Sequence, residues 1–403
     1  MNAISLEKLP GGITAVQGID ATGVHCGLRK NGSEDLALLY SRKPAAAAGV
    51  FTTNKFKAAP LLVTEKHLHH PVRAIVINSG MANACTGEQG LADALYTAEI
   101  VAGELGIEKE EVLVASTGVI GVHIPLEKIS DGIARAAQQL SPRGGAEAAR
   151  AILTTDTQSK ESACRVIAGE KSFVLGGMAK GAGMICPDMA TMLAFLATDV
   201  QIERKTLQRA LNEAVKHSFN LITVDGDTST NDMVILLANG SCGLKIEEGA
   251  SLWEPFNQAL LRVCQELAYM IVADGEGATK IIKLTVRGAP DYEGARRLAR
   301  AILNSPLVKT AFFGEDANWG RIITALGYTD VWFDPRRVDI FLGSLQVASG
   351  GEGVSFDEIR AKEVLRQREI PILVDLHLGG TEITAWGCDL STEYVEINSA
   401  YRT

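Results

Sequence analysis

One threonine, Thr191, stands in the apolar stretch MICPDMATMLAFL at residues 184–196, directly after the small residue Ala190. A threonine hydroxyl is a poor nucleophile unless a base lies beside it, and one solution uses the threonine's own α-amine. A free α-amine has a pKa of roughly 7.7–8.0, so it can accept a proton near neutral pH. That amine exists only if the chain is cut between Ala190 and Thr191. The competing interpretation is that Thr191 is a β-branched residue of a buried strand.

The residues before this junction favour a self-cleavage hypothesis. The glycines of KGAG at 180–183 and the rigid Pro187 indicate a tightly shaped turn, and Ala190 leaves room for a tetrahedral intermediate at its carbonyl. Thr191 would then cut the chain itself, through an N-to-O acyl shift followed by hydrolysis of the ester.

A second candidate chemistry lies in VDGDTSTND at 224–232, where acidic residues follow a hydrophobic run. Asp225 and Asp227 resemble the aspartyl-phosphate loop of magnesium-dependent phosphohydrolases, in which one carboxylate is the nucleophile and the other a general acid. The threonine that usually follows the second acid by two residues is Ser229 here. The alternative is a polar turn whose side chains satisfy backbone amides.

Histidine and cysteine patterns give no metal site and no serine-hydrolase site. The histidines of KHLHHP at 66–71 have no carboxylate nearby in sequence, so we expect a solvated turn there. The seven cysteines include no CxxC pair, a pattern typical of thiols in a reducing cytoplasm.

Composition bounds the class of protein. With 403 residues, 46% hydrophobic and 22% charged, the chain is globular and long enough for two or three domains. A net charge of −9 argues against nucleic acid or an anionic membrane surface as partner, so a small-molecule substrate is expected. No secretory signal and no membrane-spanning run is visible, and we expect a cytoplasmic protein.

Hydrophobic periodicity predicts alternating helices and strands, and hence an α/β fold. A helix should end at Gly106, and VLVAS at 112–116 should form a buried strand that ends at Thr117 and Gly118. Further helices are expected at 127–140, 145–153, 204–218 and 251–272, and further strands at 173–178, 192–199, 221–224 and 233–238.

A second alternating set follows DGEGATK at 274–280, so we place a domain boundary near residue 281. The main catalytic domain would span 1–280 and a C-terminal domain 281–403. In the latter we expect a strand at IIKLTV, helices at 291–303, 319–326 and 356–367, and strands at 308–313, 338–342, 372–377 and 382–387.

Eight sequence blocks together carry a family resemblance. They are NSGMANACTG at 78–87, ASTGVIG at 115–121, LTTDT at 153–157, KGAGMICPDMATML at 180–193, SFNLITVDGDTSTND at 218–232, DGEGATK, DANWGRI at 316–322 and the tail EINSAYRT. In this order they resemble the ornithine acetyltransferase family of arginine biosynthesis, also called glutamate N-acetyltransferase. The resemblance covers essentially the whole chain. It implies a self-processing N-terminal-threonine enzyme with layered α/β domains, the DmpA/ornithine-acetyltransferase-like fold.

The resemblance implies a precursor that is cut into an α chain, 1–190, and a β chain, 191–403, which assemble as a heterotetramer of two α and two β chains. Thr191 would take acetyl from N-acetylornithine as an ester, release ornithine, and pass the acetyl group to glutamate in a ping-pong cycle. No cofactor is needed, because the amide donor already carries the acetyl group. Whether acetyl-CoA is also a donor is left open.

The same resemblance assigns site residues. Thr117 and Gly118 would form the oxyanion hole, and VDGDTSTND would be a structural block beside the site. Substrate contacts would come from Thr154, Lys180, Thr191, Glu276, Asn398 and Thr403, and whether Thr154 or Thr155 points inward stays open.

Overall fold

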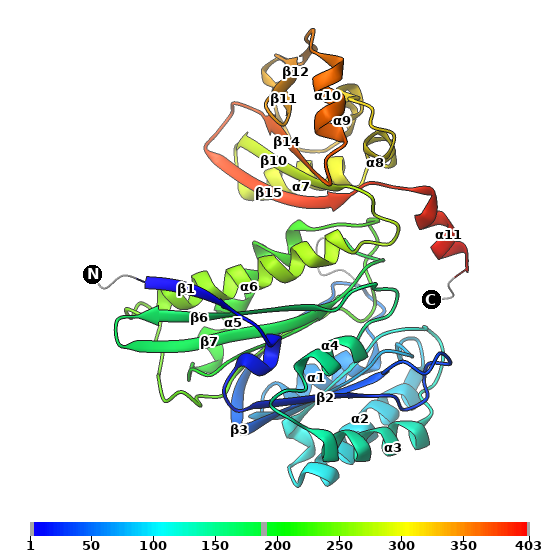
Figure 1. Ribbon diagram of the computed structural model, residues 1–403, viewed down its shortest axis with the longest axis vertical. Coiled ribbons are helices and arrows are strands. Elements are labelled where there is room, and N and C mark those ends of the chain that lie inside the picture. The colour runs from blue at the N-terminus through cyan, green and yellow to red at the C-terminus, as the bar shows by residue number, and fades with distance from the viewer. Residues whose placement is uncertain (1–3, 187–191, 401–403) are drawn as a thin grey trace.

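Two separate β-sheets organise the chain (Figure 1). The computed structural model describes residues 4–186 and 192–400. The first sheet has nine strands and the second has six, and helices pack against both. The α/β class predicted from the sequence is therefore confirmed.

The nine-stranded sheet is built from the first 238 residues of the chain. Its strand order is β1-β6-β7-β8-β9-β3-β4-β5, and β2 pairs with β3. The strands are β1 Ile4–Leu9, β2 Ile19–Val24, β3 Leu36–Phe51, β4 Val72–Asn78, β5 Val112–Ser116, β6 Lys160–Ala168, β7 Lys171–Lys180, β8 Leu193–Thr198 and β9 Met233–Ala238. The helices of this part are α1 Ala59–His67, α2 Gly87–Leu105, α3 Leu126–Gln139, α4 Gly145–Ala151, α5 Arg204–Lys216 and α6 Trp253–Ala273.

Strand β3 joins the two halves of this sheet. Its first part pairs with β4 and its last part, 46–51, pairs with β9. The register shifts between Tyr40 and Ala45, where Arg42 to Pro44 are exposed. Proline lacks an N–H group, so Pro44 suits the point at which the strand leaves one pairing for the next.

The parallel strands β8 and β9 form the centre of the sheet and are buried on both faces. Successive side chains of a strand point to opposite faces. Leu196 accordingly packs in the hydrophobic cluster under α5 and α6, whereas Phe195 packs in the cluster that includes α1 and α4. Burying a side chain of this size stabilises the fold by about 1.5–3 kcal/mol. The apolar side chains of β8 therefore hold this strand firmly in register.

The six-stranded sheet has the order β13-β12-β11-β14-β10-β15. Its strands are β10 Ile281–Ala289, β11 Asp339–Leu342, β12 Leu345–Ser349, β13 Glu352–Gly353, β14 Glu369–Asp375 and β15 Thr381–Cys388. Its helices are α7 Tyr292–Leu303, α8 Pro306–Phe313, α9 Trp319–Gly327 and α10 Glu358–Leu365, and α11 Thr392–Ala400 follows the last strand. Figure 1 shows α11, in red, to one side of this sheet.

Three local expectations were wrong. Residues 308–313 are part of helix α8, because Ser305 caps the helix by accepting from the amide of Val308 and Pro306 occupies its first turn. Residues 221–224 form no strand, only a 3₁₀ turn and an isolated bridge from Ile222 to Trp386. His67 is not solvated: it is buried in α1, with Nδ1 2.7 Å from the carbonyl oxygen of Val112.

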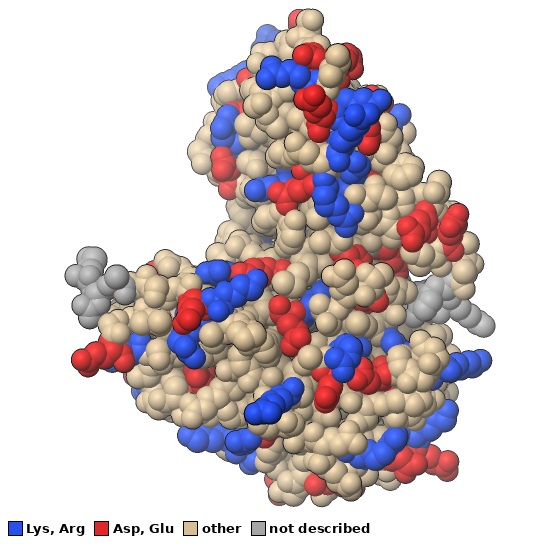
Figure 2. Space-filling model, viewed as in Figure 1, with Lys and Arg blue, Asp and Glu red and all other residues tan. Residues whose placement is uncertain are grey.

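Charges of both signs are interspersed over the face shown in Figure 2. Within 4–186 and 192–400, no helix combines the length and apolar character that crossing a membrane requires.

Candidate active site

A cavity of about 200 Å³ gathers side chains from distant parts of the chain. Six residues that the sequence resemblance assigns to the site line it: Thr117, Gly118, Thr154, Lys180, Glu276 and Asn398. Thr155 lines it as well. Ala190, Thr191 and Thr403 lie outside the described residues.

Thr117 and Gly118 follow directly after strand β5. The amide of Thr117 donates to the carbonyl of Asn78 at the end of the neighbouring strand β4. Gly118 has φ +125°, and a Cβ added there would lie 2.4 Å from the carbonyl oxygen of Gly80. Only glycine fits, because a side chain would meet backbone that cannot move aside. This close packing fixes the backbone turn of Thr117 and Gly118, and both residues line the cavity.

Lys180 ends strand β7, and its ammonium is buried at the cavity, with 2% of the residue exposed. It donates to the hydroxyl of Thr117 at 3.3 Å. In the β7–β8 pair Lys180 lies opposite Leu193, two residues after Thr191. Strand pairing thus places the start of β8, which follows the predicted cleavage point, beside the lysine. Sequence spacing alone does not reveal this proximity.

Glu276 and Asn398 lie next to each other in the wall of the cavity. Asn398 Nδ2 donates to Glu276 Oε2 at 2.7 Å, and the amide of Glu276 donates to Ala182 at 2.9 Å. A Cβ on Gly183 would lie 2.4 Å from the Glu276 carboxylate. The glycine-rich segment 180–183 therefore lets an acidic side chain lie directly against its backbone.

The C-terminal helix α11 is held at the site by further hydrogen bonds. Tyr394 Oη donates to Asp225 Oδ2 at 3.2 Å, and Ser391 Oγ donates to the carbonyl of Gly277 at 2.6 Å. Together with Asn398 these contacts bring one face of an otherwise exposed helix onto the cavity.

Asp225 organises the chain just before the junction. Its carboxylate accepts from the amides of Met184 at 2.6 Å and Ile185 at 2.9 Å, and from the amide of Asp227 at 3.2 Å. Burial raises the pKa of Asp225. Because backbone amides and Tyr394 occupy both oxygens, the phosphohydrolase alternative built on Asp225 and Asp227 finds no support, and the segment is a polar turn.

Two residues of the same segment have positions that the sequence did not indicate. Asn231 Nδ2 donates to the carbonyls of Ala82 and Ser116 at 2.7 and 2.8 Å, and so links this turn to the strand end before Thr117. Asp232 Oδ1 accepts from the amide of Met192 at 2.9 Å. Burial raises the pKa of Asp232 well above its ordinary value. The sequence signal for Asn231 and Asp232 was their position directly before the apolar run of β9.

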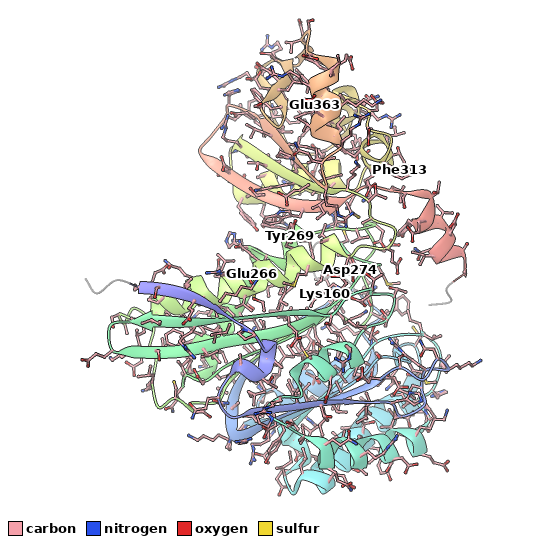
Figure 3. The ribbon with its side chains drawn as sticks, in the orientation of Figure 1. Lys160, Glu266, Tyr269, Asp274, Phe313 and Glu363 are labelled. Carbon is pink, nitrogen blue, oxygen red and sulfur yellow. The ribbon has the colours of Figure 1, made fainter. Side chains whose placement is uncertain are left out.

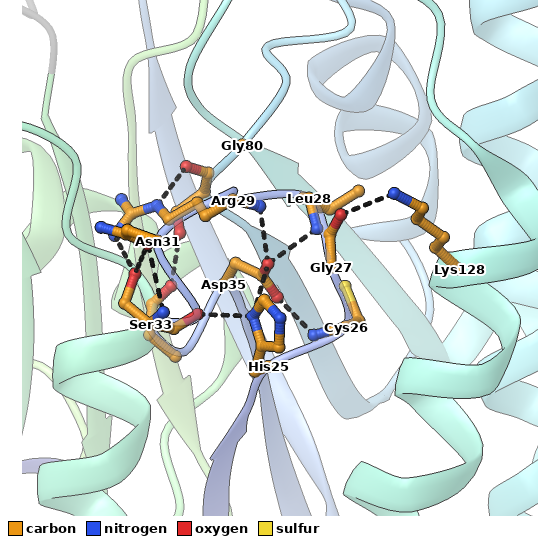
Figure 4. A network of polar contacts seen from close by, with 12 residues as sticks. His25, Cys26, Gly27, Leu28, Arg29, Asn31, Ser33, Asp35, Gly80 and Lys128 are labelled. Atoms are coloured by element: carbon orange, nitrogen blue, oxygen red, sulfur yellow. Dashed lines mark hydrogen bonds and ion pairs between the residues drawn. The ribbon is translucent and has the colours of Figure 1, made fainter.

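A further buried carboxylate, that of Asp35, fixes the loop that carries Arg29. Asp35 accepts from the amides of Cys26, Leu28 and Arg29 at 2.6, 2.8 and 2.9 Å (Figure 4). Burial alone would raise the pKa of Asp35, but these hydrogen bonds outweigh it and the pKa is lowered. Arg29 Nε in turn donates to the carbonyl of Ser79 at 3.2 Å. These contacts hold Arg29 against the turn that follows β4.

Comparisons with known proteins identify the family of this chain. Residues 20–403 match the ArgJ protein family. The arginine biosynthesis bifunctional protein ArgJ of Symbiobacterium thermophilum is 53% identical over 402 residues, covering 99% of this chain and 100% of that protein. The protein of the same name from Bacillus subtilis is 46% identical over 401 residues, covering 99% and 98%. Among solved structures, the ornithine acetyltransferase of Mycobacterium tuberculosis complexed with ornithine is 41% identical over 45% of this chain and 98% of that one, with a TM-score of 0.43. This chain belongs to the ArgJ family.

Proposed function

We propose that this chain is an acetyltransferase of arginine biosynthesis that moves acetyl from N-acetylornithine to glutamate through an ester of Thr191. Family membership over 20–403 and the names of the curated relatives support the pathway. The observation that carries the site is the cavity lined by Thr117, Lys180, Glu276 and their neighbours beside strand β8. The active form would arise by self-cleavage between Ala190 and Thr191.

In the first half-reaction the Thr191 hydroxyl attacks the acetyl carbonyl while its α-amine accepts the proton. The developing oxyanion would lie between the backbone of Gly118 and the hydroxyl of Thr117, where preorganised donors stabilise the negative charge. The bond from the acetyl carbon to the α-nitrogen of ornithine then breaks, and that nitrogen takes the proton. Acetyl-Thr191 and ornithine result.

In the second half-reaction the α-amine of glutamate attacks the ester carbon. The bond to the Thr191 oxygen breaks, the hydroxyl is restored, and N-acetylglutamate leaves. Lys180 offers an ammonium to a substrate carboxylate, and Glu276 and Thr154 offer acceptors to an amine. The same groups serve donor and acceptor because both are amino acids. No cofactor enters either step.

Acetyl-CoA is the second donor that we propose. The word bifunctional in the names of the relatives favours a second activity. A thioester could acetylate Thr191 in the same way as the amide, and glutamate would then complete an identical second step.

Organisation and location complete the proposal. We propose domains at 1–280 and 281–403 on the ground that the strands of the second sheet begin with β10 at Ile281. We propose two α and two β chains in the active assembly, on the family resemblance alone. A cytoplasmic location is supported by the seven cysteines, which form no disulfide.

The first test compares the purified protein with Thr191→Ala and Thr191→Ser on a denaturing gel. We expect two bands whose masses sum to 42.9 kDa. The α chain should end at Ala190, and the β chain should begin with TMLAF. Thr191→Ala should stay intact, whereas Thr191→Ser keeps the hydroxyl that attacks the preceding carbonyl and should still be cut. Intact unmutated protein that nevertheless transfers acetyl to glutamate would contradict the proposed nucleophile.

A further inference from the structure

A buried lysine lies beside the cavity and takes no part in the steps above. Lys160, the first residue of β6, is 1% exposed. Its ammonium donates to Asp156 Oδ1 at 2.7 Å, Asp274 Oδ2 at 2.6 Å and the carbonyl of Gln158 at 3.1 Å. Figure 3 shows Lys160 and Asp274 where the end of α6 meets the sheet. Since all three ammonium hydrogens have acceptors, Lys160 is not a substrate ligand.

The two carboxylates that hold Lys160 also fasten the segments that line the cavity. Asp156 Oδ1 accepts from the amide of Gly181 at 2.6 Å, and Oδ2 accepts from the amide of Thr154 at 3.0 Å. Asp274, which lies two residues before Glu276, accepts from the amides of Thr157 and Gln158. Three cavity segments, 154–158, 180–181 and 274–276, thus share one buried network.

This network also sets the charge around Lys180. Burial is the largest influence on the pKa of Lys180 and lowers it. The negative charges of Asp156 and of Asp232, directly before β9, raise this pKa, whereas the positive charges of Lys160 and of Arg29, in the loop after β2, lower it. Burial would raise the pKa of Asp156, but Lys180 and Lys160 outweigh it and hold that pKa at about 2. Asp156 is therefore an anion across the physiological range. It pairs with Lys160 at 2.7 Å, and its hydrogen bond to the amide of Gly181 places it beside the backbone of Lys180.

We propose that Asp156 and Lys160 are positioning residues for Lys180. Asp156 fixes the backbone on either side of the cavity and supplies the counter-charge that keeps the Lys180 ammonium cationic, and Lys160 limits that attraction by sharing the same carboxylate. The inference rests on the proposed function, in which Lys180 binds a substrate carboxylate.

Two substitutions should move the pH dependence in opposite directions. Binding requires cationic Lys180, so kcat/KM for N-acetylornithine falls as pH rises through its pKa. Asp156→Asn removes a negative neighbour and should shift this high-pH fall to lower pH by on the order of one pH unit, whereas Lys160→Gln removes a positive neighbour and should shift it upward. The matched control is Asp274→Asn, which removes the other carboxylate of Lys160 but is not among the main influences on Lys180.

A purely structural network makes a different prediction. All three variants would then lose activity and thermal stability while the fall in kcat/KM stayed at the pH of the unmutated enzyme, and that result would overturn the proposal. Acetyl transfer that is absent from the unmutated enzyme would instead contradict the proposed function, so the two failures are distinct.

Because breaking a buried ion pair can prevent folding, a second test spares the network. In Lys180→Arg the guanidinium stays protonated, so the high-pH fall of kcat/KM should move to higher pH. A fall at the same pH in Lys180→Arg and in the unmutated enzyme would show that Lys180 is not the titrating group and would likewise overturn the proposal.

Discussion

Asn398 donates a hydrogen bond of 2.7 Å to Glu276, which lies 122 residues earlier in the chain. The pair joins the C-terminal helix α11 to the segment after α6, and both residues line the cavity. The end of the chain therefore forms part of the site wall.

Loss of this contact should weaken substrate binding. A hydrogen bond to a charged group contributes about 1.5–3 kcal/mol, so Asn398→Ala should lower kcat/KM for glutamate by roughly 10- to 100-fold. The matched control is Ser399→Ala on the same helix, whose hydroxyl bonds only within the helix in the described contacts. Steady-state kinetics of both variants test this, and equal values would show that the Asn398–Glu276 hydrogen bond does not contribute to substrate binding.

Gly118→Ala should abolish most of the activity. The added methyl would press on the carbonyl of Gly80 at 2.4 Å and displace the turn that faces the cavity. Loss of one oxyanion donor typically costs about 100- to 1000-fold in kcat. Gly121→Ala is the control, since Gly121 also has positive φ, +77°, but a Cβ there meets nothing within 4 Å. A comparable loss in both variants would point to backbone strain and not to the oxyanion site.

Asp232→Asn should stabilise the protein more at pH 7 than at pH 4. Burial raises the folded-state pKa of Asp232, so the unmutated protein loses stability from this group as pH rises above its unfolded value of about 3.9. An asparagine cannot ionise and can still accept from the amide of Met192. Denaturant unfolding at the two pH values, in a Thr191→Ala background that keeps both samples uncut, measures the difference. A stability difference independent of pH would mean that the pKa of Asp232 is the same in the folded and the unfolded protein.

Asp225→Asn should destabilise the site, whereas Asp227→Asn should not. An amide group in place of Asp225 would turn N–H toward the amides of Met184 or Ile185, at a cost of about 1–3 kcal/mol. Asp227 is exposed, and its contribution is limited to its backbone amide in the described hydrogen bonds. Thermal unfolding of the two variants tests the contrast. Equal destabilisation by the two substitutions would contradict the role assigned to the Asp225 carboxylate.

The sequence by itself determined the α/β class, the strands around the junction and the family. These depend on local patterns: apolar runs such as MVILLA at 233–238 have few ways to be buried, and a glycine that ends a helix does so wherever the helix lies. The sequence blocks that indicate the family can likewise be recognised without a structure, because each block keeps its own residue types and spacing.

Only the tertiary structure decided what surrounds those motifs. Helix α8 formed where a strand was expected, since a capping serine and Pro306 outweighed a short apolar run. The partners of Lys160 come from a loop and from the end of α6, and Asn398 meets Glu276 through the docking of the last helix. Such contacts depend on long-range packing, and a buried charge finds its partner only when the elements have assembled. The nucleophile that we propose could thus be predicted from the sequence, but the buried charges around the cavity could not.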